Sequence, residues 1–327
     1  MPKRVLITGV SGFVGHHLVE QAINLGYEVF GAVRPNSEID HLKEFNIQFR
    51  HLNFTDVEAL KEDIGANKYD YIIHAAGITK AKTLDDYNLV NATYSKNLAL
   101  ATIGTQVKKF VFVSSLAAIG PLNDLTSIIT GDQLPKPVTS YGISKLNAER
   151  SLRELKELPL IVIRPTAVYG PREKDIFILF ESLNKGLEPY IGSFDQRLSF
   201  IYVKDLVNVI FKSLNTNINH QAYNISDGKA YDRFALADIA KKELGKKTFK
   251  FHIPLPVVKL LASTLDFLYK NSATTPALNK EKLAELTAIN WICSIEDAKT
   301  ALDFEPTFDL NAGLRDTLEW YRKNNWL

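Results

Sequence analysis

Short apolar runs alternate with segments of helical periodicity through the first half of the chain. The runs are rich in Val, Ile, Phe and Tyr and predict strands at Arg4–Thr8, Glu28–Val33, Ile47–Leu52, Tyr71–His74, Lys109–Ser114 and Leu160–Arg164. Helical spacing of apolar residues lies between most of them, at His16–Leu25, Val57–Ile64 and Asn88–Ile103. Strands that alternate with helices in this way are joined by right-handed crossovers, so the pattern predicts an α/β fold with a doubly wound parallel sheet.

The alternation changes after Pro171, where helices mix with short strands. Residues 199–226 have the pattern of a return to the sheet. We therefore predict a Rossmann domain over residues 1–172 and a smaller, mixed α/β lobe over most of residues 173–327. No internal repeat or low-complexity linker separates the two parts, so the cleft between them is the expected ligand site.

Composition excludes several classes of partner. Lys and Arg total 39 against 37 Asp and Glu, a formal net charge of +2, and neither sign forms a block. Nucleic acid and membrane surfaces are therefore not expected partners. The single cysteine, Cys293, rules out an intramolecular disulfide and a thiolate metal cluster, so no metal site is predicted.

No segment of the chain has the pattern of a membrane anchor or a secretory signal. The apolar run at Met1–Ile7 stops too early for a signal peptide. The longest apolar tract, Ile253–Tyr269, is interrupted by Lys259 and Asp266 and is too short for a membrane span. We expect it to be an amphipathic helix, and we expect a cytoplasmic protein.

A glycine-rich turn follows the first predicted strand and opens the first predicted helix. Glycine allows both a tight turn and the close approach of a diphosphate to backbone amides at a helix N-terminus. Because strand, glycines and helix come in this order, the segment predicts a dinucleotide site and not a plain turn. Its predicted contact residues are Gly9, Ser11, Gly12, Phe13, Val14 and Gly15.

The end of the second predicted strand indicates which dinucleotide is bound. An acidic residue there hydrogen-bonds the adenosine ribose, whereas an arginine accommodates a 2′-phosphate. Here Arg34 and Ser37 offer a cation and a hydroxyl, so NADP is favoured over NAD. In the alternative interpretation, Arg34 stacks on the adenine while Glu38 or Asp40 reaches the ribose.

A second motif contains Tyr141 and Lys145, which are four residues apart and share one face of a predicted helix. A nearby ammonium favours the ionised phenol, so the pair is suited to acid/base chemistry. This spacing alone is more typical of a solvated helix face. Ser115 changes the interpretation, because it follows a predicted strand whose carboxyl end faces the ligand crevice, although a strand-end cap is its alternative role.

Together these motifs resemble the extended short-chain dehydrogenase/reductase family, also called the NAD-dependent epimerase/dehydratase family. The resemblance covers almost the whole chain. The motifs that carry it are Gly9–Gly15, Asp70–Gly77, Asn91, Ser114 with Ser115, Tyr141 with Lys145, Arg164–Pro171, Phe200–Asp205, Tyr223–Ile225 and Gly313–Tyr321.

The resemblance implies a role for each site residue. Tyr141 would be the acid/base, Lys145 would lower its pKa and bind the nicotinamide ribose, and Ser115 would polarise the substrate oxygen. Asn53, where the family more often has aspartate, and Phe54 would lie beside the adenine. The remaining implied cofactor contacts are Ala75, Ala76, Gly77, Asn91, Ser114, Pro165 and Val168. A homodimer through the helices around residues 88 and 141 is also implied.

Several positions depart from the family pattern and argue against particular reactions and substrates of the family. Sugar 4,6-dehydratases carry an Asp-Glu pair where this chain has Leu116 and Ala117, so dehydration is not expected. Epimerisation through an enol needs a further acid/base, and Cys293 is far from the motifs in the sequence. Many nucleotide-sugar enzymes have an arginine where Leu198 stands. Arg197 is one step early, and one step in a strand reverses the face, which argues against a nucleotide-linked substrate.

Two segments favour a less polar substrate. Residues 32–34 look like the cofactor turn of dihydroflavonol-reductase-like members, and the apolar helix Val257–Leu268 resembles an insertion in those and in 3β-hydroxysteroid-dehydrogenase-like members. Its leucines, at positions 260, 261, 265 and 268, are most simply interpreted as core packing of the small lobe, with a wall for a hydrophobic substrate as the alternative.

The sequence thus predicts an NADP-dependent oxidoreductase that moves hydride between the cofactor and a carbonyl or alcohol carbon of a small molecule. One alternative is a nucleotide-sugar 4-epimerase that retains NAD. The other is a non-catalytic protein that senses NADP, which the presence of Ser115, Tyr141 and Lys145 disfavours.

Overall fold

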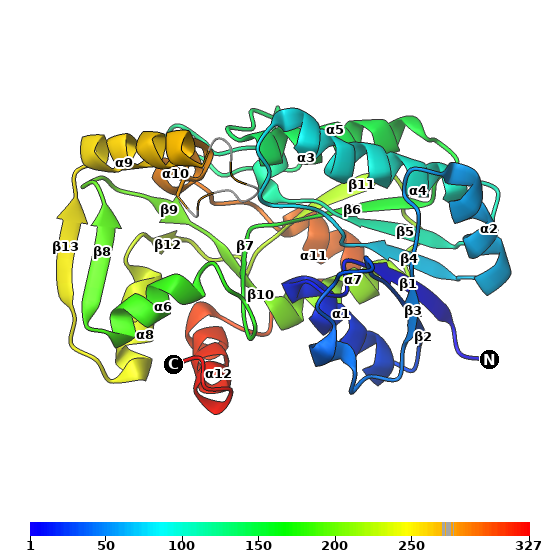
Figure 1. Cartoon of the computed structure of the whole chain (residues 1–327), viewed down its shortest axis with the longest axis horizontal. Coiled ribbons are helices and arrows are strands. Elements are labelled where there is room, and N and C mark those ends of the chain that lie inside the picture. Colours follow the sequence, from blue (N-terminus) through cyan, green and yellow to red (C-terminus); the bar gives the residue numbers. More distant parts are fainter. Residues whose placement is uncertain (270–271, 273–275, 277) are drawn as a thin grey trace.

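The computed structural model describes residues 1–269, 272, 276 and 278–327. A seven-stranded parallel sheet with the order β11-β6-β5-β4-β1-β2-β3 forms its larger part (Figure 1). This order confirms the predicted doubly wound α/β fold. The strands are β1 (Arg4–Thr8), β2 (Glu28–Ala32), β3 (Gln48–Arg50), β4 (Tyr71–His74), β5 (Lys109–Val113), β6 (Leu160–Pro165) and β11 (Gln221–Ile225).

Helices cover both faces of this sheet, because its central strands bury alternate residues on opposite sides. In β1, Val5 and Ile7 belong to one core cluster and Leu6 to another. The first cluster includes residues of α1 (Phe13–Asn24), α7 (Val203–Ser213) and α11 (Glu296–Leu302). The second includes residues of α2 (Val57–Asn67), α4 (Tyr94–Thr102) and α5 (Ser140–Glu154). Near-continuous apolar strands are typical of a parallel sheet buried on both faces.

The helix expected at Asn88–Ile103 is three segments in the structure. It begins earlier, as α3 (Leu84–Asn88), where Thr83 and Asp86 form a capping box. A π-helical turn, Leu89–Thr93, follows and leads into α4. Hydrophobic periodicity cannot distinguish this turn from continuous α-helix, and π-helical turns are frequent at functional sites.

The smaller lobe lies at the carboxyl edge of the sheet, on the left in Figure 1. Two short strands, β7 (Ala167–Tyr169) and β10 (Phe200–Tyr202), pair in parallel and lead into it. Its other elements are α6 (Phe177–Asn184), β8 (Leu187–Ile191), β9 (Arg197–Leu198), β12 (Tyr231–Asp232), α8 (Ala235–Leu244), β13 (Phe249–Ile253), α9 (Leu255–Leu268), α10 (Lys280–Thr287) and α12 (Leu310–Lys323). The domain boundary at residue 172 stays a prediction.

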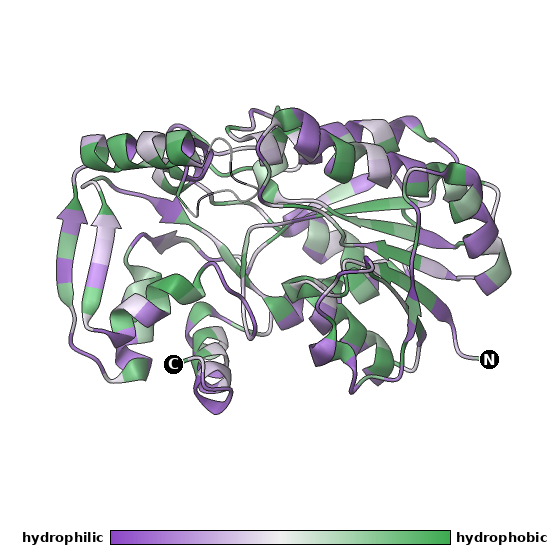
Figure 2. Cartoon of the chain, viewed as in Figure 1, coloured by the Kyte–Doolittle hydropathy of each residue, from purple (hydrophilic) through white to green (hydrophobic). Residues whose placement is uncertain are grey.

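The expectation that the leucines of α9 are core residues is wrong for Leu260, Leu261 and Leu268, whereas Leu265 is half-buried. Leu260, Leu261 and Leu268 are exposed, and the buried residues of the helix are Val258 and Ala262. The helix is apolar on both sides, so composition alone does not reveal which side packs. Figure 2 shows hydrophobic residues recurring along α9 at the outer edge of the small lobe. None of the described helices is long and apolar enough to cross a bilayer.

Candidate active site

The glycine-rich turn between β1 and α1 forms a cradle that only glycine can line. A Cβ at Gly15 would lie 2.0 Å from the Gly9 carbonyl oxygen, and a Cβ at Gly9, whose φ is +76°, would lie 2.8 Å from the Ala76 nitrogen. Gly12 is the N-cap of α1, and among the described residues no side chain caps this helix. Its first backbone N–H groups are therefore available to an anion, so the turn fits a dinucleotide diphosphate.

Two adjoining cavities, of about 830 and 550 Å³, extend from this turn along the carboxyl edge of the sheet. Every residue predicted to form the site lines one of them, with the exception of Asn91. The larger cavity is lined by Gly9, Ser11, Gly12, Phe13, Val14, Gly15, Arg34, Ser37, Ala75, Gly77, Ser114, Ser115, Tyr141, Lys145, Pro165 and Val168, and the smaller one adds Asn53, Phe54 and Ala76.

Arg34 and Ser37 lie together at the rim of both cavities. The backbone N–H of Arg34 donates to the Ser37 hydroxyl oxygen at 3.0 Å, and the Arg34 side chain is exposed. Glu38 also lines the larger cavity, whereas Asp40 forms an ion pair with Lys43 at 2.7 Å. The geometry therefore leaves Glu38, but not Asp40, as an acidic residue beside Arg34.

The loop after β4 is fixed by a buried histidine. His74 hydrogen-bonds Thr8 Oγ1 at 2.7 Å and Ser95 Oγ at 2.8 Å, and Thr8 Oγ1 accepts from the Ala76 N–H at 3.0 Å. Burial lowers the pKa of His74 to about 3, so the imidazole is neutral. This chain of bonds connects β1, β4 and α4, and Thr8 and His74 line the smaller cavity. The sequence contained His74 within a motif but did not reveal this role.

Asn91 lies behind the cavity and not in its lining. Its Oδ1 accepts from the Ile78 N–H at 2.8 Å, and its Nδ2 donates to the Ile78 carbonyl at 3.0 Å and to Ser144 Oγ at 2.9 Å. Ser144 Oγ in turn donates to the Tyr141 carbonyl at 2.7 Å. The predicted direct cofactor contact is therefore replaced by a positioning role, in which the π-helical turn connects the loop at Ile78 to the first turn of α5.

Ser115 and Tyr141 face the larger cavity from adjacent elements. Ser115 is the N-cap of a short 3₁₀ turn, Leu116–Ala118, and its Oγ accepts from the Ala117 N–H at 3.1 Å. Tyr141 lies in the first turn of α5. The two elements are in close contact at Gly142, because a Cβ there would lie 2.4 Å from the Ala117 carbonyl oxygen. This contact keeps the two hydroxyls within interaction range of each other.

Burial is the largest influence on the pKa of Tyr141 in the structure, and the role of Lys145 in lowering that pKa stays a prediction. Burial raises the pKa of Tyr141 to about 12, and the hydrogen bond with Ser115 offsets this only in part. Burial also lowers the pKa of Lys145 to about 8, although the nearby Glu149 opposes the shift. Desolvation is therefore the largest influence on the pKa of both groups. Tyr141 is therefore a protonated group near neutral pH.

Lys145 is held in place by β5. Its Nζ donates to the Val113 carbonyl at 2.9 Å and lies 4.8 Å from the centre of the Phe112 ring. A Cβ at Gly77 would lie 3.2 Å from this ammonium, so glycine leaves room for it at the cavity wall. Lys145 therefore presents a fixed cation beside Tyr141.

A buried ion pair behind Ser115 was not predicted from the sequence. Arg164 on β6 donates to both carboxylate oxygens of Glu149, with Nε–Oε1 at 2.9 Å and Nη2–Oε2 at 2.5 Å. Ser114 Oγ donates to the same carboxylate at 2.6 Å. Ser114 therefore lines the cofactor cavity while its hydroxyl is bound to this buried carboxylate. The network connects α5 to the carboxyl ends of β5 and β6.

A third cavity, of about 430 Å³, shares Ser115, Pro165, Thr166 and Asp175 with the larger cofactor cavity and extends into the small lobe. Most of its walls are apolar, from residues such as Leu198 and Trp291. None of the described residues that line it belongs to α9, so the alternative of α9 as a substrate wall is not realised. This is the expected substrate side of the cleft.

The cations around this third cavity make contacts with other groups of the chain. Arg197 donates to the Leu125 carbonyl at 2.7 Å and does not line the cavity, whereas Leu198 does, as the strand register predicts. Arg233 donates to the Phe194 and Ile191 carbonyls at 2.6 and 2.7 Å. Lys282 pairs with Glu285 at 3.1 Å. Arg233 Nε is buried without a hydrogen-bond partner among the described residues, so Arg233 and Lys282 are the cations that the described lining offers to a charged substrate.

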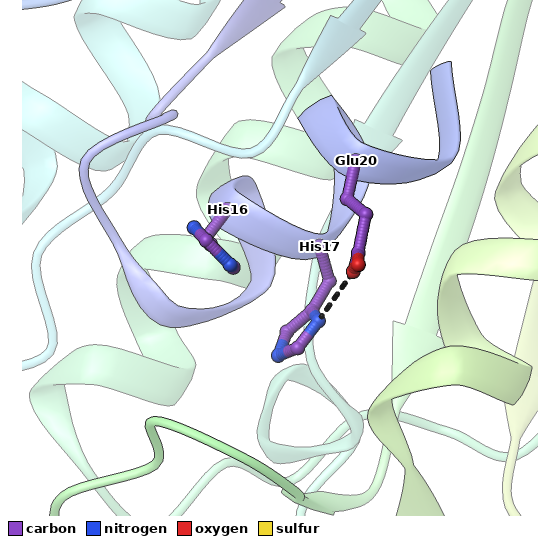
Figure 3. Close-up of side chains that lie close together, drawn as sticks. All are labelled: His16, His17 and Glu20. Atoms are coloured by element: carbon purple, nitrogen blue, oxygen red, sulfur yellow. Dashed lines mark ion pairs between the residues drawn. The ribbon is translucent and has the colours of Figure 1, made fainter. Parts of the chain in front are cut away.

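Three potential metal ligands lie on α1 below the glycine turn. One ligand atom from each of His16, His17 and Glu20 lies within 4.8 Å of the others. Figure 3 shows His16 pointing to a different side of the helix from the other two. Glu20 pairs with His17 at 3.5 Å, and His17 Nε2 bonds the Pro171 carbonyl at 2.9 Å. These contacts join α1 to the loop after β7.

Several known proteins are similar to this chain over almost their whole length. A UDP-glucose 4-epimerase of Vibrio cholerae is 26% identical over 99% of this chain and 97% of its own. A sterol-4-alpha-carboxylate 3-dehydrogenase (decarboxylating) of Candida albicans is 27% identical over 98% of each chain. A ceramide reductase of Caulobacter vibrioides is 27% identical over 99% of this chain and 96% of its own.

Structural comparison supports the same fold. The crystal structure of the UDP-glucose 4-epimerase of Thermotoga maritima with UDP-glucose is similar, with a TM-score of 0.82, 23% identity and coverage of 98% of this chain and 99% of that chain. The model of the NAD-dependent epimerase/dehydratase family matches residues 5–226. The chain therefore belongs to the NAD-dependent epimerase/dehydratase family and is an enzyme of that family.

Proposed function

We propose that this enzyme reversibly reduces a ketone or aldehyde to an alcohol with NADP(H). One observation carries the proposal: Ser115, Tyr141 and Lys145 line the groove that fits a dinucleotide, and Ser115 also lines the apolar cavity that opens from it. A substrate oxygen that entered from the apolar side would meet both hydroxyls. The three side chains thus have the chemistry and the location of a proton-transfer centre.

The nicotinamide of the bound cofactor would supply the hydride. In the direction of reduction, Tyr141 gives its phenolic proton to the substrate oxygen. Ser115 Oγ already accepts a backbone N–H, which leaves its own hydrogen to donate to the same oxygen. The fixed ammonium of Lys145 stabilises the negative charge that develops on the phenol. A phenol with a pKa of about 12 carries its proton at neutral pH, so the proton is present when the carbonyl substrate binds.

The choice of NADP over NAD is part of this proposal. It is supported by Arg34 at the cavity rim, by the Ser37 hydroxyl beside it and by the absence of an acidic residue at the described end of β2, where Ala32 and Val33 stand. Glu38 is the competing group, because a carboxylate at the rim would suit the ribose hydroxyls of NAD.

The relatives also support a substrate with a large apolar part. Two of them are named for a sterol and for ceramide. The apolar walls of the third cavity suit such a molecule, and Arg233, the arginine in its described lining, donates to main-chain carbonyls. We therefore propose a carbonyl or alcohol on an amphiphilic small molecule.

A nucleotide-sugar 4-epimerase is the second candidate, because the Vibrio relative carries that activity in its name. An epimerase keeps its cofactor through a cycle of oxidation and reduction, whereas a reductase exchanges it at each turnover. The purified protein should therefore be denatured and its released nucleotide measured. Little copurified dinucleotide and rapid NADPH exchange support reduction, and stoichiometric retained NAD supports epimerisation.

The Tyr141→Phe variant tests catalysis itself. In a reductase this change removes the proton donor, so NADPH-dependent turnover should fall by about a thousandfold or more. NADPH affinity should stay near that of the wild type. Unchanged turnover would favour a protein that only senses the cofactor.

A homodimer and a cytoplasmic location stay predictions, and light scattering would test the homodimer.

A further inference from the structure

Helix α9 carries two apolar stripes on opposite sides. Val258 and Ala262 form the inner stripe and pack with Leu283 of α10. The outer stripe recurs at spacings of three and four residues, so its members share one side of the helix, and they are exposed. Leu260, Phe267 and Leu268 are 70%, 76% and 67% exposed. The outer stripe consists of Val257, Leu260, Leu261, Thr264, Phe267 and Leu268.

A surface helix of a globular protein normally turns polar residues outward. The one polar member of the outer stripe, Thr264, donates its hydroxyl to the Leu260 carbonyl at 2.9 Å, so it needs no water. Ser263, beside the stripe, donates to the Lys259 carbonyl at 2.9 Å in the same way. Removing the outer side of α9 from water would therefore leave neither of these hydroxyl groups without a hydrogen-bond partner.

Two exposed lysines and one aspartate are charged residues beside the stripe. Lys259 on α9 and Lys280 at the start of α10 are exposed. Asp266 is the acidic residue of α9, and its carboxylate accepts from the Lys280 backbone N–H at 3.3 Å, which turns it toward α10. Long lysine side chains can extend beyond an apolar surface and place their ammonium groups among anionic headgroups.

We propose that α9 is an interfacial helix that inserts its outer stripe into the surface of an anionic lipid bilayer. At 14 residues it is about 21 Å long, which suits a helix lying in the plane of the interface. This proposal revises the expectation of no membrane partner. It goes beyond the proposed reaction and does not depend on it.

The position of α9 gives the contact a consequence for the active site. α10 packs against α9 and contributes Lys282, Glu285 and Leu286 to the lining of the apolar cavity. Ile191, which also lines that cavity, packs against the inner stripe. A bilayer that covers the outer stripe would therefore lie next to the substrate side of the cleft, where an amphiphilic substrate could enter from lipid.

Flotation of the full-length protein with vesicles tests the proposal. We expect binding to vesicles of phosphatidylcholine with phosphatidylglycerol, and about fivefold weaker binding of Lys259→Gln to them. The double variant Leu260→Ser/Phe267→Ser should lose about a hundredfold in partitioning. The matched control is Leu134→Ser, since Leu134 is 74% exposed on a different segment and should bind as the wild type does.

The proposal is wrong if the wild type does not float with anionic vesicles, or if the double variant floats equally well. It is also wrong if the wild type does not bind vesicles, light scattering shows it to be an oligomer, and the double variant is a monomer. A second copy of the chain would then cover the stripe. NADPH affinity of the double variant should match the wild type. Loss of flotation with normal NADPH binding thus separates this proposal from the proposed reaction.

Discussion

At the scale of single residues, burial dominates the chemistry of the site. The spacing of Tyr141 and Lys145 suggested an acidified phenol, but desolvation moves the pKa of the phenol up and that of the ammonium down. The spacing of two residues in the sequence predicts how far apart their side chains lie, but not how far each is exposed to water. The residue types were thus predictable, and their protonation was not.

These pKa shifts predict opposite pH dependence for the two directions of reaction. Tyr141, with a pKa of about 12, carries its proton at neutral pH, so reduction should be independent of pH up to about pH 8. Above that, Lys145 loses its charge and reduction should slow. Oxidation needs the phenolate and should accelerate as the pH rises. Initial rates in both directions measure this, and Lys145→Met should lack the break near pH 8.

Arg34 should determine the preference for NADPH. Its guanidinium lies exposed at the cavity rim, where a 2′-phosphate would gain a charge-assisted hydrogen bond of about 2 kcal/mol. In calorimetric titration, Arg34→Ala should weaken NADPH binding by roughly thirtyfold and leave NADH binding nearly unchanged. Equal losses for both cofactors would show that Arg34 stacks on the adenine instead.

At the scale of elements, close packing brings the site together. Strands and most helices were predictable because apolar periodicity is strong in a sheet that is buried on both faces. The π-helical turn with Asn91 and the ion pair of Glu149 with Arg164 were not, because each depends on contacts between elements distant in sequence. Exposure of the α9 leucines also depends on which neighbours happen to cover them.

Gly142 should be essential for the alignment of Tyr141 with Ser115. In Gly142→Ala the new methyl would lie 2.4 Å from the Ala117 carbonyl oxygen, so α5 has to move away from the 3₁₀ turn. We expect kcat to fall by about a hundredfold with little change in NADPH affinity. Gly65→Ala in α2 is the matched control, because no atom lies within 4 Å of its new methyl. Equal kcat in both variants would contradict this.

Removal of one charge from the buried ion pair should destabilise the whole sheet edge. Glu149→Gln leaves Arg164 without a counter-charge in the core, which typically costs about 3 kcal/mol or more. Chemical denaturation should show this loss in the free energy of unfolding. Glu154→Gln, at an exposed position of the same helix, should unfold like the wild type. A small effect for Glu149→Gln would mean that water reaches Arg164.

At the scale of the whole molecule, the cleft arises where the carboxyl edge of the sheet meets the small lobe. The fold class and the location of the glycine turn followed from the sequence, since both depend on local patterns. The apolar cavity did not, because its walls come from segments between residues 115 and 291 that only the tertiary structure brings together. Substrate preference therefore depends on the tertiary structure and not on local sequence patterns.

The central claim is that hydride and proton transfer meet at Ser115 and Tyr141, and a crystal structure with NADPH bound tests it most directly. We expect the diphosphate on the glycine turn, the 2′-phosphate beside Arg34 and the nicotinamide ring facing the Tyr141 and Ser115 hydroxyls at the mouth of the apolar cavity. A nicotinamide ring that lies outside this groove, with both hydroxyls turned away from it, would contradict the account.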